Sequence, residues 1–201
     1  MRSIEKSSGL VLPGRRQFLR AAGVATLSAA TVGILAGNPA MAGSKAKGKK
    51  SAEHDAGILN VALGLEWEGI GAYQLGAESG LLSKGVLDVA VLFQSHHKAH
   101  ADALVGAIKQ LGGKPVEPKS NADYAAALNA ASLKSEADVL MLALKLEKGA
   151  ANAYLGVIPS FTDAAFAQVS GRLAADEVMH WTALAQALGK SIPAEALSFG
   201  A

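Results

Sequence analysis

The sequence predicts an all-α fold, a four-helix bundle in which a long crossover joins two helical hairpins. Three observations predict it. Hydrophobic residues make up 50% of the chain and aromatic residues only 5%, a composition typical of closely packed helices. Apolar residues recur at intervals of three and four in four separate segments. The connections inside each half are short, whereas the central one is long enough to run back along the bundle.

The composition excludes several classes of site. The chain contains no cysteine, so disulfides, thiolate metal sites, iron–sulfur clusters and cysteine nucleophiles are excluded. Five of the 19 Lys and Arg residues and one of the 17 Asp and Glu residues lie in residues 1–42, so the remainder carries a net charge of −2. The basic character therefore belongs to the N-terminus, and we expect no nucleic-acid binding.

Residues 1–42 are not expected to belong to the fold. The segment GRRQFLR, with Arg15 and Arg16, is followed by a mild apolar run at 21–35 and by an Ala-x-Ala sequence that ends at Ala42. A charged start, an apolar middle and this ending describe an export signal that is cleaved after Ala42. An uncleaved membrane anchor is the alternative interpretation.

The paired arginines resemble the twin-arginine export signal. This resemblance implies the twin-arginine export machinery as a partner and a periplasmic or otherwise exported location. The apolar run is too short to span a bilayer as a helix, so we expect no stable membrane span in the mature chain.

The mature chain is expected to begin with a flexible basic leader at 43–55, because the segment SKAKGKK is a short basic tail. His54 lies in this leader and is expected to be unstructured. The helical domain is expected to occupy residues 56–201.

The first hairpin is predicted from residues 56 to 111. In the first helix, at 56–79, Glu66 lies within the apolar stripe, and Gly80 fits the helix end. The second helix is predicted at 84–111, after Ser83, and the sequence GGKP stops it. One face of this helix combines apolar residues with two histidines, His97 and His100.

The crossover at 115–134 is expected to contain a short helical piece at 122–131. The third helix is predicted to begin near Ser135, whose hydroxyl can cap it, and to end at Pro159. The fourth is predicted to begin after Asp163 and to end at Gly189. Both helices place polar residues in their apolar stripes, namely Glu147, Tyr154, Glu177 and His180.

The two halves repeat one polar pattern about 80 residues apart, which indicates a duplicated hairpin. In the first helix of each half, a tyrosine follows a glutamate by seven residues, or two turns along one face. In the second helix of each half, two polar residues are three positions apart. The matched pairs are Glu66 and Glu147, Tyr73 and Tyr154, His97 and Glu177, and His100 and His180.

Residues 56–189 resemble the ferritin-like superfamily, in particular its exported bacterial proteins of unassigned role. The pattern of that family is Glu on the first helix, Glu-x-x-His on the second, Glu on the third and Glu-x-x-His on the fourth. Five of the six positions match. The resemblance implies a ferritin-like bundle whose metal ligands are Glu66, His97, His100, Glu147, Glu177 and His180.

His97 departs from this pattern, because the family has a glutamate there. A carboxylate can bridge two metals, but one imidazole nitrogen has a single lone pair and cannot, so only Glu177 is expected in a bridging place. More nitrogen shifts the preference from a paired iron centre toward mixed-ligand Fe, Zn or Cu. We expect one or two iron ions, with Zn, Mn or Cu as alternatives. A register that uses Gln94 instead is rejected, because Gln94 falls off the apolar stripe.

Tyr73 and Tyr154 are expected to pack in the core and to support the glutamates by hydrogen bonds, with a redox-active phenol as the alternative. Trp67 and Trp181 are expected between helices or at an oligomer face, which is consistent with a homo-oligomer. His96 is expected at the solvent-facing rim.

These observations favour an exported metal-binding protein that handles oxygen, peroxide or ferrous iron in envelope stress, as an oxidoreductase or in metal handling. The alternative is a non-catalytic envelope or stress protein whose buried Glu and His network, without a metal, holds the helices in register. Iron storage in a hollow shell is a third interpretation, although the sequence shows no obvious fifth helix.

Overall fold

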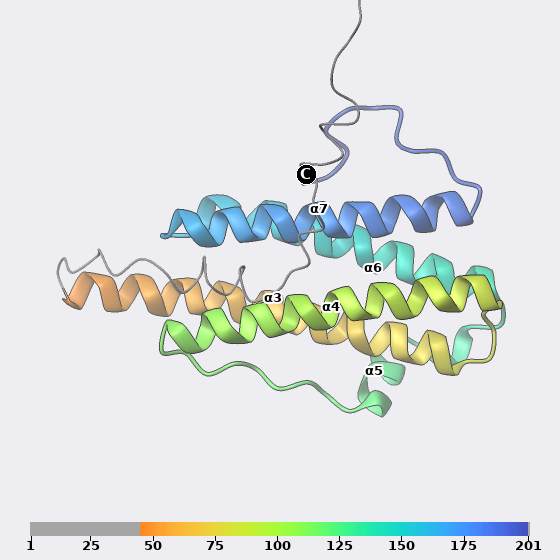
Figure 1. Ribbon diagram of the computed structural model, residues 1–201, viewed down its shortest axis with the longest axis horizontal. Coiled ribbons are helices and arrows are strands. Elements are labelled where there is room, and N and C mark those ends of the chain that lie inside the picture. Colours follow the sequence, from red (N-terminus) through yellow and green to blue (C-terminus); the bar gives the residue numbers. More distant parts are fainter. Residues whose placement is uncertain (1–44, 201) are drawn as a thin grey trace, which may run out of the picture.

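The computed structural model describes residues 45–200 and contains a bundle of four long helices (Figure 1). Two antiparallel hairpins lie against each other, and a short helix lies in the crossover between them. The described residues form no β-strand. The helices are α3 (Lys45–Glu78), α4 (Lys84–Gln110), α5 (Asn121–Ala127), α6 (Glu136–Val157) and α7 (Ala164–Ala187), with single 3-10 turns η1 (Ala130–Ser132) and η2 (Ile158–Ser160). The predicted all-α bundle is therefore confirmed.

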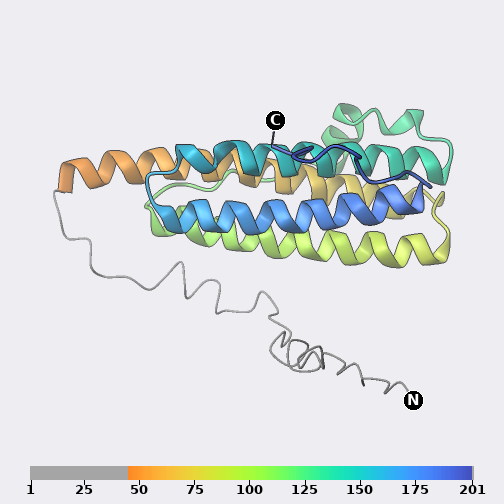
Figure 2. The same cartoon turned by 90° about the horizontal axis from the view of Figure 1, so that it is seen from above.

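The crossover makes α4 and α6 parallel, as expected from its length (Figures 1 and 2). Its helix α5 is shorter than the predicted piece, because Asn129 adopts a φ of 51° in the left-handed region and interrupts the helix before η1. The side chain of Tyr124 in α5 lies over Gly71 of α3, where an added Cβ would come within 2.6 Å of the Tyr124 ring. Gly71 thus allows the crossover to pack closely on the first hairpin.

The helix ends follow the capping residues of the sequence. Ser135 accepts a hydrogen bond from Asp138 N at the start of α6, and Asp163 accepts one from Ala165 N at the start of α7. Gly189 follows α7 with a φ of 65°, a conformation that favours glycine at a helix end.

The first helix begins at Lys45, so the expected flexible leader is wrong for the described residues from Lys45 onward. Contacts of Asp55 and His54 account for the part of this difference that lies next to residue 56. The buried carboxylate of Asp55 accepts hydrogen bonds from Thr162 N at 2.9 Å, Thr162 Oγ1 at 2.7 Å and Asp163 N at 3.1 Å. His54 is helical too, and its Nε2 is hydrogen-bonded to Ser160 O at 2.9 Å. Contacts with the turn before α7 thus hold α3 in place at residues 54 and 55, and they join residues more than 100 positions apart.

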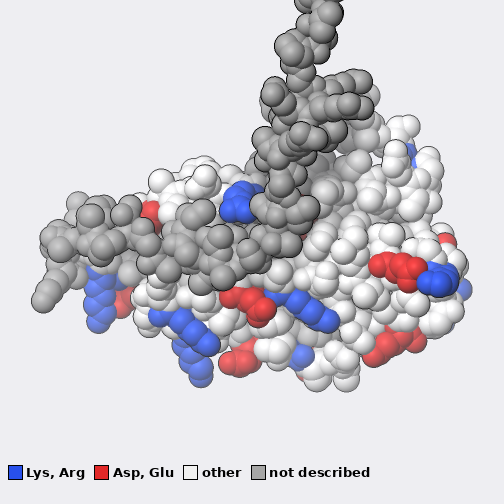
Figure 3. All heavy atoms as spheres, in the orientation of Figure 1, with Lys and Arg blue, Asp and Glu red and all other residues white. Residues whose placement is uncertain are grey.

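The predicted export signal at 1–42 lies outside the described residues. Among the helices that are described, none is long and apolar enough to cross a membrane. On the face shown in Figure 3, Lys and Arg side chains are interspersed with Asp and Glu side chains.

Two apolar clusters make up the core, one toward each end of the bundle. The first includes Leu63, Leu104, Ile108 and Leu173, and the second includes Phe93, Leu140, Leu144, Trp181 and Leu184. Trp181 packs edge-on against Phe199 at a ring distance of 5.2 Å, and Trp67 donates a hydrogen bond to Val116 O at 3.0 Å. Buried polar side chains lie between these clusters, and they form the candidate site.

Candidate metal centre

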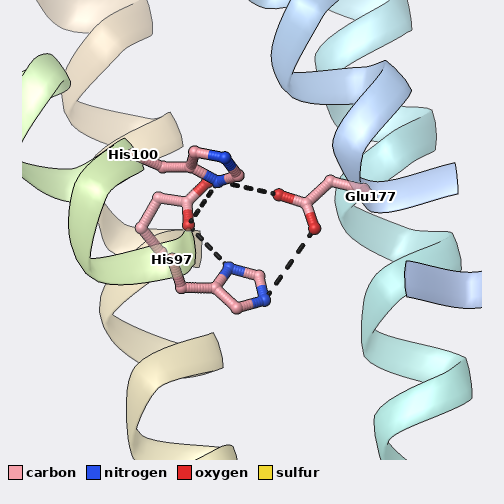
Figure 4. Close-up of side chains that lie close together, drawn as sticks. His97, His100 and Glu177 are labelled. Atoms are coloured by element: carbon pink, nitrogen blue, oxygen red, sulfur yellow. Dashed lines mark hydrogen bonds and ion pairs between the residues drawn. The ribbon is translucent and has the colours of Figure 1, made fainter. Parts of the chain in front are cut away.

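Six acidic and histidine side chains meet in the interior of the bundle. All four long helices contribute, and each of the six residues is at most 4% exposed. Figure 4 shows His97 and His100 of α4 and Glu177 of α7 pointing toward one another. The structure thus brings together all six positions expected from the sequence, which are Glu66, His97, His100, Glu147, Glu177 and His180.

The first half of the centre contains Glu66, His97, His100 and Glu177, whose donor atoms lie within 4.8 Å of one another. Glu66 Oε2 is 2.7 Å from His97 Nδ1. His100 Nδ1 lies 3.5 Å from Glu66 Oε2 and 3.4 Å from Glu177 Oε1. Two carboxylate oxygens and two imidazole nitrogens thus surround one point.

The second half contains His97, Glu147, Glu177 and His180, again with donor atoms within 4.8 Å of one another. His180 Nδ1 lies 3.5 Å from Glu147 Oε2 and 3.3 Å from Glu177 Oε2. His97 Nε2 lies 3.3 Å from Glu147 Oε1. This half repeats the composition of the first, as the duplicated sequence pattern suggests.

Two residues are common to both halves. Glu177 directs Oε1 toward His100 and Oε2 toward His180. His97 is shared as well, because its Nδ1 faces Glu66 and its Nε2 faces Glu147. Only Glu177 was expected between the halves, since a single imidazole nitrogen cannot bridge. In the structure the two nitrogens of one ring point to different halves.

Two tyrosine hydroxyls hold the glutamates of the first and third long helices. Tyr73 on α3 donates to Glu147 Oε1 on α6, and Tyr154 on α6 donates to Glu66 Oε1 on α3. Each tyrosine therefore contacts the glutamate of the other hairpin. Burial raises the pKa of both phenols well above the ordinary value, and the nearby carboxylate on each raises it further, so both phenols keep their protons.

The outward-facing nitrogens of two histidines are also hydrogen-bonded. His100 Nε2 lies 3.2 Å from Asp176 Oδ2, and His180 Nε2 lies 2.9 Å from His96 Nδ1. A proton on each Nε2 leaves the Nδ1 lone pair directed at the centre. The sequence predicts no role for Asp176 and predicts His96 at the solvent-facing rim, whereas His96 is half-buried against His180. The internal repeat could have indicated both residues. Asp176 directly precedes Glu177, and His96 directly precedes His97, which is the equivalent position in the other half.

The charges within the centre compensate one another. Burial alone would raise the pKa of Glu66, but the imidazoles of His100 and His97 outweigh it and lower the pKa to about 2. Burial alone would lower the pKa of His97, but its hydrogen bonds with Glu147 and Glu66 raise it to about 10. Burial raises the pKa of Glu177 above its ordinary value. The protein groups alone therefore favour an ionised Glu66 paired with a protonated His97.

This compensation leaves several buried polar atoms without partners. An unpaired buried donor or acceptor costs about 1–3 kcal/mol. Carboxylate oxygens and imidazole nitrogens are atom types that Fe, Mn, Zn and Cu take as ligands, so the donor set at these positions fits a metal ion. The atoms without a hydrogen-bond partner among the described residues are His100 Nδ1, Glu147 Oε2, Glu177 Oε1, Glu177 Oε2 and His180 Nδ1.

Gln94 points away from the centre. It is buried, but its Nε2 donates to Ile70 O at 3.1 Å and to Gln74 Oε1 at 2.8 Å. The structure thus agrees with the register in which His97, rather than Gln94, faces the interior.

Comparisons with known proteins agree with this architecture. The family model described as ferritin-like domain matches residues 54–190. The crystal structure of a conserved hypothetical protein from Mycobacterium tuberculosis is similar with a TM-score of 0.57 and 19% identity, and the match covers 73% of this chain and 99% of that chain. At this identity the likeness concerns the fold alone. No curated protein matches the sequence.

Proposed function

Because the chain belongs to the ferritin-like domain family, we propose that it is a metal-binding protein whose buried glutamates and histidines hold one or two iron ions. The observation that supports this proposal is the pair of four-residue groups at the centre of the bundle, with partnerless donor atoms directed into both. A cation in either group compensates the buried carboxylates and accepts the free lone pairs.

Each ion would have its own set of ligands. Glu66 and His100 would help to hold an ion in the first group, and Glu147 and His180 would help to hold one in the second. Glu177 and His97 lie in both groups, so each would contribute to either ion. Binding through both ring nitrogens would require His97 to lose both of its N–H protons. Metal binding to histidine releases protons in general.

The residues around the centre suit an ion that changes its charge. Iron, when bound, would supply one-electron exchange with oxygen or peroxide. The carboxylates of Glu66, Glu147 and Glu177 can adapt to a change in charge, and Tyr73 and Tyr154 hold two of them in place. The apolar clusters on either side keep bulk water from these groups. We therefore propose a role in oxygen, peroxide or ferrous iron handling.

Metal content tests this function directly. The purified chain is reconstituted separately with Fe, Mn, Zn and Cu, and bound metal is measured by elemental analysis. We expect one or two ions per chain for the preferred metal, and a loss of at least half of them in Glu177→Ala. Asp102→Asn is the matched control, because Asp102 is exposed on α4. Less than one ion per chain with all four metals would refute the proposal.

We further propose that the protein is exported through the twin-arginine pathway to act in envelope stress. The support is the sequence around Arg15 and Arg16 and the cleavage sequence that ends at Ala42. Replacing both arginines with lysine should retain the full-length precursor inside the cell. Unchanged export of this variant, measured by fractionation and immunoblotting, would contradict the proposal.

One observation favours a second candidate function. Hydrogen bonds between Tyr154 and Glu66, Tyr73 and Glu147, and His97 and Glu66 already connect three of the four long helices without an ion. A metal-free polar network could therefore hold the helices in register. The dependence of thermal stability on metal, considered in the Discussion, separates the two functions.

A further inference from the structure

A cavity of about 380 Å³ lies at one end of the bundle and reaches the candidate metal centre. It occupies the region where α3 and α7 end and α4 and α6 begin. All four long helices line it, and the crossover contributes Leu128 and Leu133. The cavity thus lies between the two hairpins, on one side of the buried polar residues.

Small residues contribute to this space. Gly76 and Ala72 of α3 and Ala143 of α6 line the cavity, together with larger apolar side chains such as Leu140 and Leu184. Gly149 is also in the lining; it is exposed, and an added Cβ there would meet nothing within 4 Å. The remaining lining is largely apolar and includes Val86.

The inner end of the cavity is formed by the centre itself. Tyr73, His97 and Glu147 all contribute to the lining. The face of the His97 ring lies on Gly69, where an added Cβ would come within 3.2 Å of its Nδ1. A molecule in the cavity would therefore lie next to the one residue at which the family ligand pattern changes.

The lining determines which molecule fits. Apart from the groups of the centre, the charged residues in it are Glu68 and Lys145, and Lys145 is exposed. A hydrated cation would lose its water against these walls without gaining polar partners, which is costly. Water itself is held weakly in an apolar cavity, whereas an apolar molecule gains by leaving water. The volume lies near the lower end of the range for small-molecule pockets, roughly 300–1,000 Å³.

We propose that this cavity binds a small, uncharged and mainly aliphatic molecule beside His97. The binding follows from the cavity alone. A role for that molecule as the substrate of the centre rests on the proposed function. The same apolar walls make this cavity unsuited as an entry route for metal ions.

Binding of linear primary alcohols tests the proposal. Isothermal titration of the full chain with a series from butan-1-ol to decan-1-ol should show binding that strengthens about fourfold per added methylene, the ratio expected for transfer from water to an apolar site. The increase should stop once the cavity is full. Histidine ring signals in NMR should show a shift for His97 on addition of octan-1-ol and none for His54, which is exposed near the other end of α3.

Two filling variants test the location of the bound alcohol. Ala143→Phe and Gly149→Leu should each weaken octan-1-ol binding at least tenfold. Gly156→Leu is the matched control on the same helix, since Gly156 is not in the lining and an added Cβ there also meets nothing within 4 Å. Circular dichroism verifies folding, and leucine has a higher helix propensity than glycine, so Gly149→Leu is expected to fold.

Absence of alcohol binding to the wild-type chain, or equal binding by wild type and both filling variants, would overturn the proposal. Alcohol binding that the filling variants remove, in a protein that takes up no metal, would retain the cavity site and refute the metal centre. Metal uptake without alcohol binding would retain the metal centre and refute the cavity site. The two proposals can therefore fail separately.

Discussion

His97 contacts both halves of the centre with a single ring. Its Nδ1 is 2.7 Å from Glu66 Oε2, and its Nε2 is 3.3 Å from Glu147 Oε1. A glutamate at this position, as in the ferritin-like pattern, would offer two oxygens on one carbon atom. The imidazole instead offers two nitrogens on opposite sides of a rigid ring. Histidine in place of the glutamate of the family pattern therefore changes the distance between the two donor atoms. Both halves of the centre still share this residue.

Removing each histidine should have a distinct effect on metal content. If two ions bind, His100→Ala and His180→Ala should each remove one, because each of these residues belongs to a single half. His97→Ala should weaken binding of both ions at least tenfold, because it removes a ligand from each half. Metal titration followed by elemental analysis measures this. An unchanged affinity for both ions in His97→Ala would show that this ring does not bind metal.

The metal-stripped protein should be most stable in mildly acidic solution. The pKa of His97 is about 10 against an ordinary value of 6.5, so its stabilising contribution is complete below pH 6.5 and is lost as the pH rises toward 10. The pKa of Glu66 is about 2 against 4.5, so its contribution is present above pH 4.5 and is lost as the pH falls toward 2.

Urea unfolding with chelator present, at several pH values, measures this dependence. The free energy of unfolding should fall on both sides of the window between 4.5 and 6.5. A double variant, Glu66→Gln with His97→Gln, should show a flatter profile and serves as the control. Stability that rises from neutral to alkaline pH in the wild type would contradict the proposed pairing.

At the scale of the elements, the hydrogen bonds around the centre join the two hairpins. Tyr73 contacts Glu147 of the other hairpin, and His100 contacts Asp176 of the other hairpin. The contacts of Tyr154 with Glu66 and of His96 with His180 are their counterparts in the repeat. Neither hairpin can satisfy these groups alone, so the duplicated halves depend on each other.

Asp55 of α3 makes a similar long-range contact with the turn before α7. Asp55→Ala should lower the free energy of unfolding by about 1–3 kcal/mol, because Thr162 N and Asp163 N lose a buried acceptor. Glu53→Ala is the control, since Glu53 is exposed on the same helix. Chemical denaturation measures both changes. Equal, small effects of the two substitutions would show that Asp55 does not stabilise the end of the bundle.

At the scale of the whole molecule, metal binding and folding should be coupled. The six residues of the centre come from all four long helices, so the unfolded chain cannot present them together. A ligand that binds only the folded state at 100 times its dissociation constant stabilises that state by about 2.7 kcal/mol. Metal should therefore stabilise the complete bundle rather than one helix.

Thermal melting with and without chelator tests this coupling. The metal-loaded wild type should melt at a higher temperature, and chelator should remove the difference. A variant that lacks Glu177 should show a smaller difference between the two treatments, because it retains at most half of the metal. An unchanged midpoint for the wild type would favour the metal-free polar network as the function of these residues.

The four long helices and the six polar positions could be predicted from the amino-acid sequence. Helix periodicity is local, so Glu66, Glu147, Glu177 and His180 could be placed in apolar stripes without knowing the partner helices. Capping residues such as Ser135 likewise act within a few positions of the helix end that they define. The internal repeat also predicted the two matched tyrosines. Each follows a glutamate by seven residues, which places both side chains on the same face of the helix.

How these helices meet could be learned only from their packing in three dimensions. The contact of Asp55 with the turn before α7, the contacts of His96 and Asp176, and the shared position of His97 all depend on how far one hairpin lies from the other and how it is rotated. The cavity beside His97 depends on the same spacing, because small residues leave a space only where the facing helix does not fill it. Such distances arise from packing between residues far apart in the chain. Local periodicity carries no information about that packing.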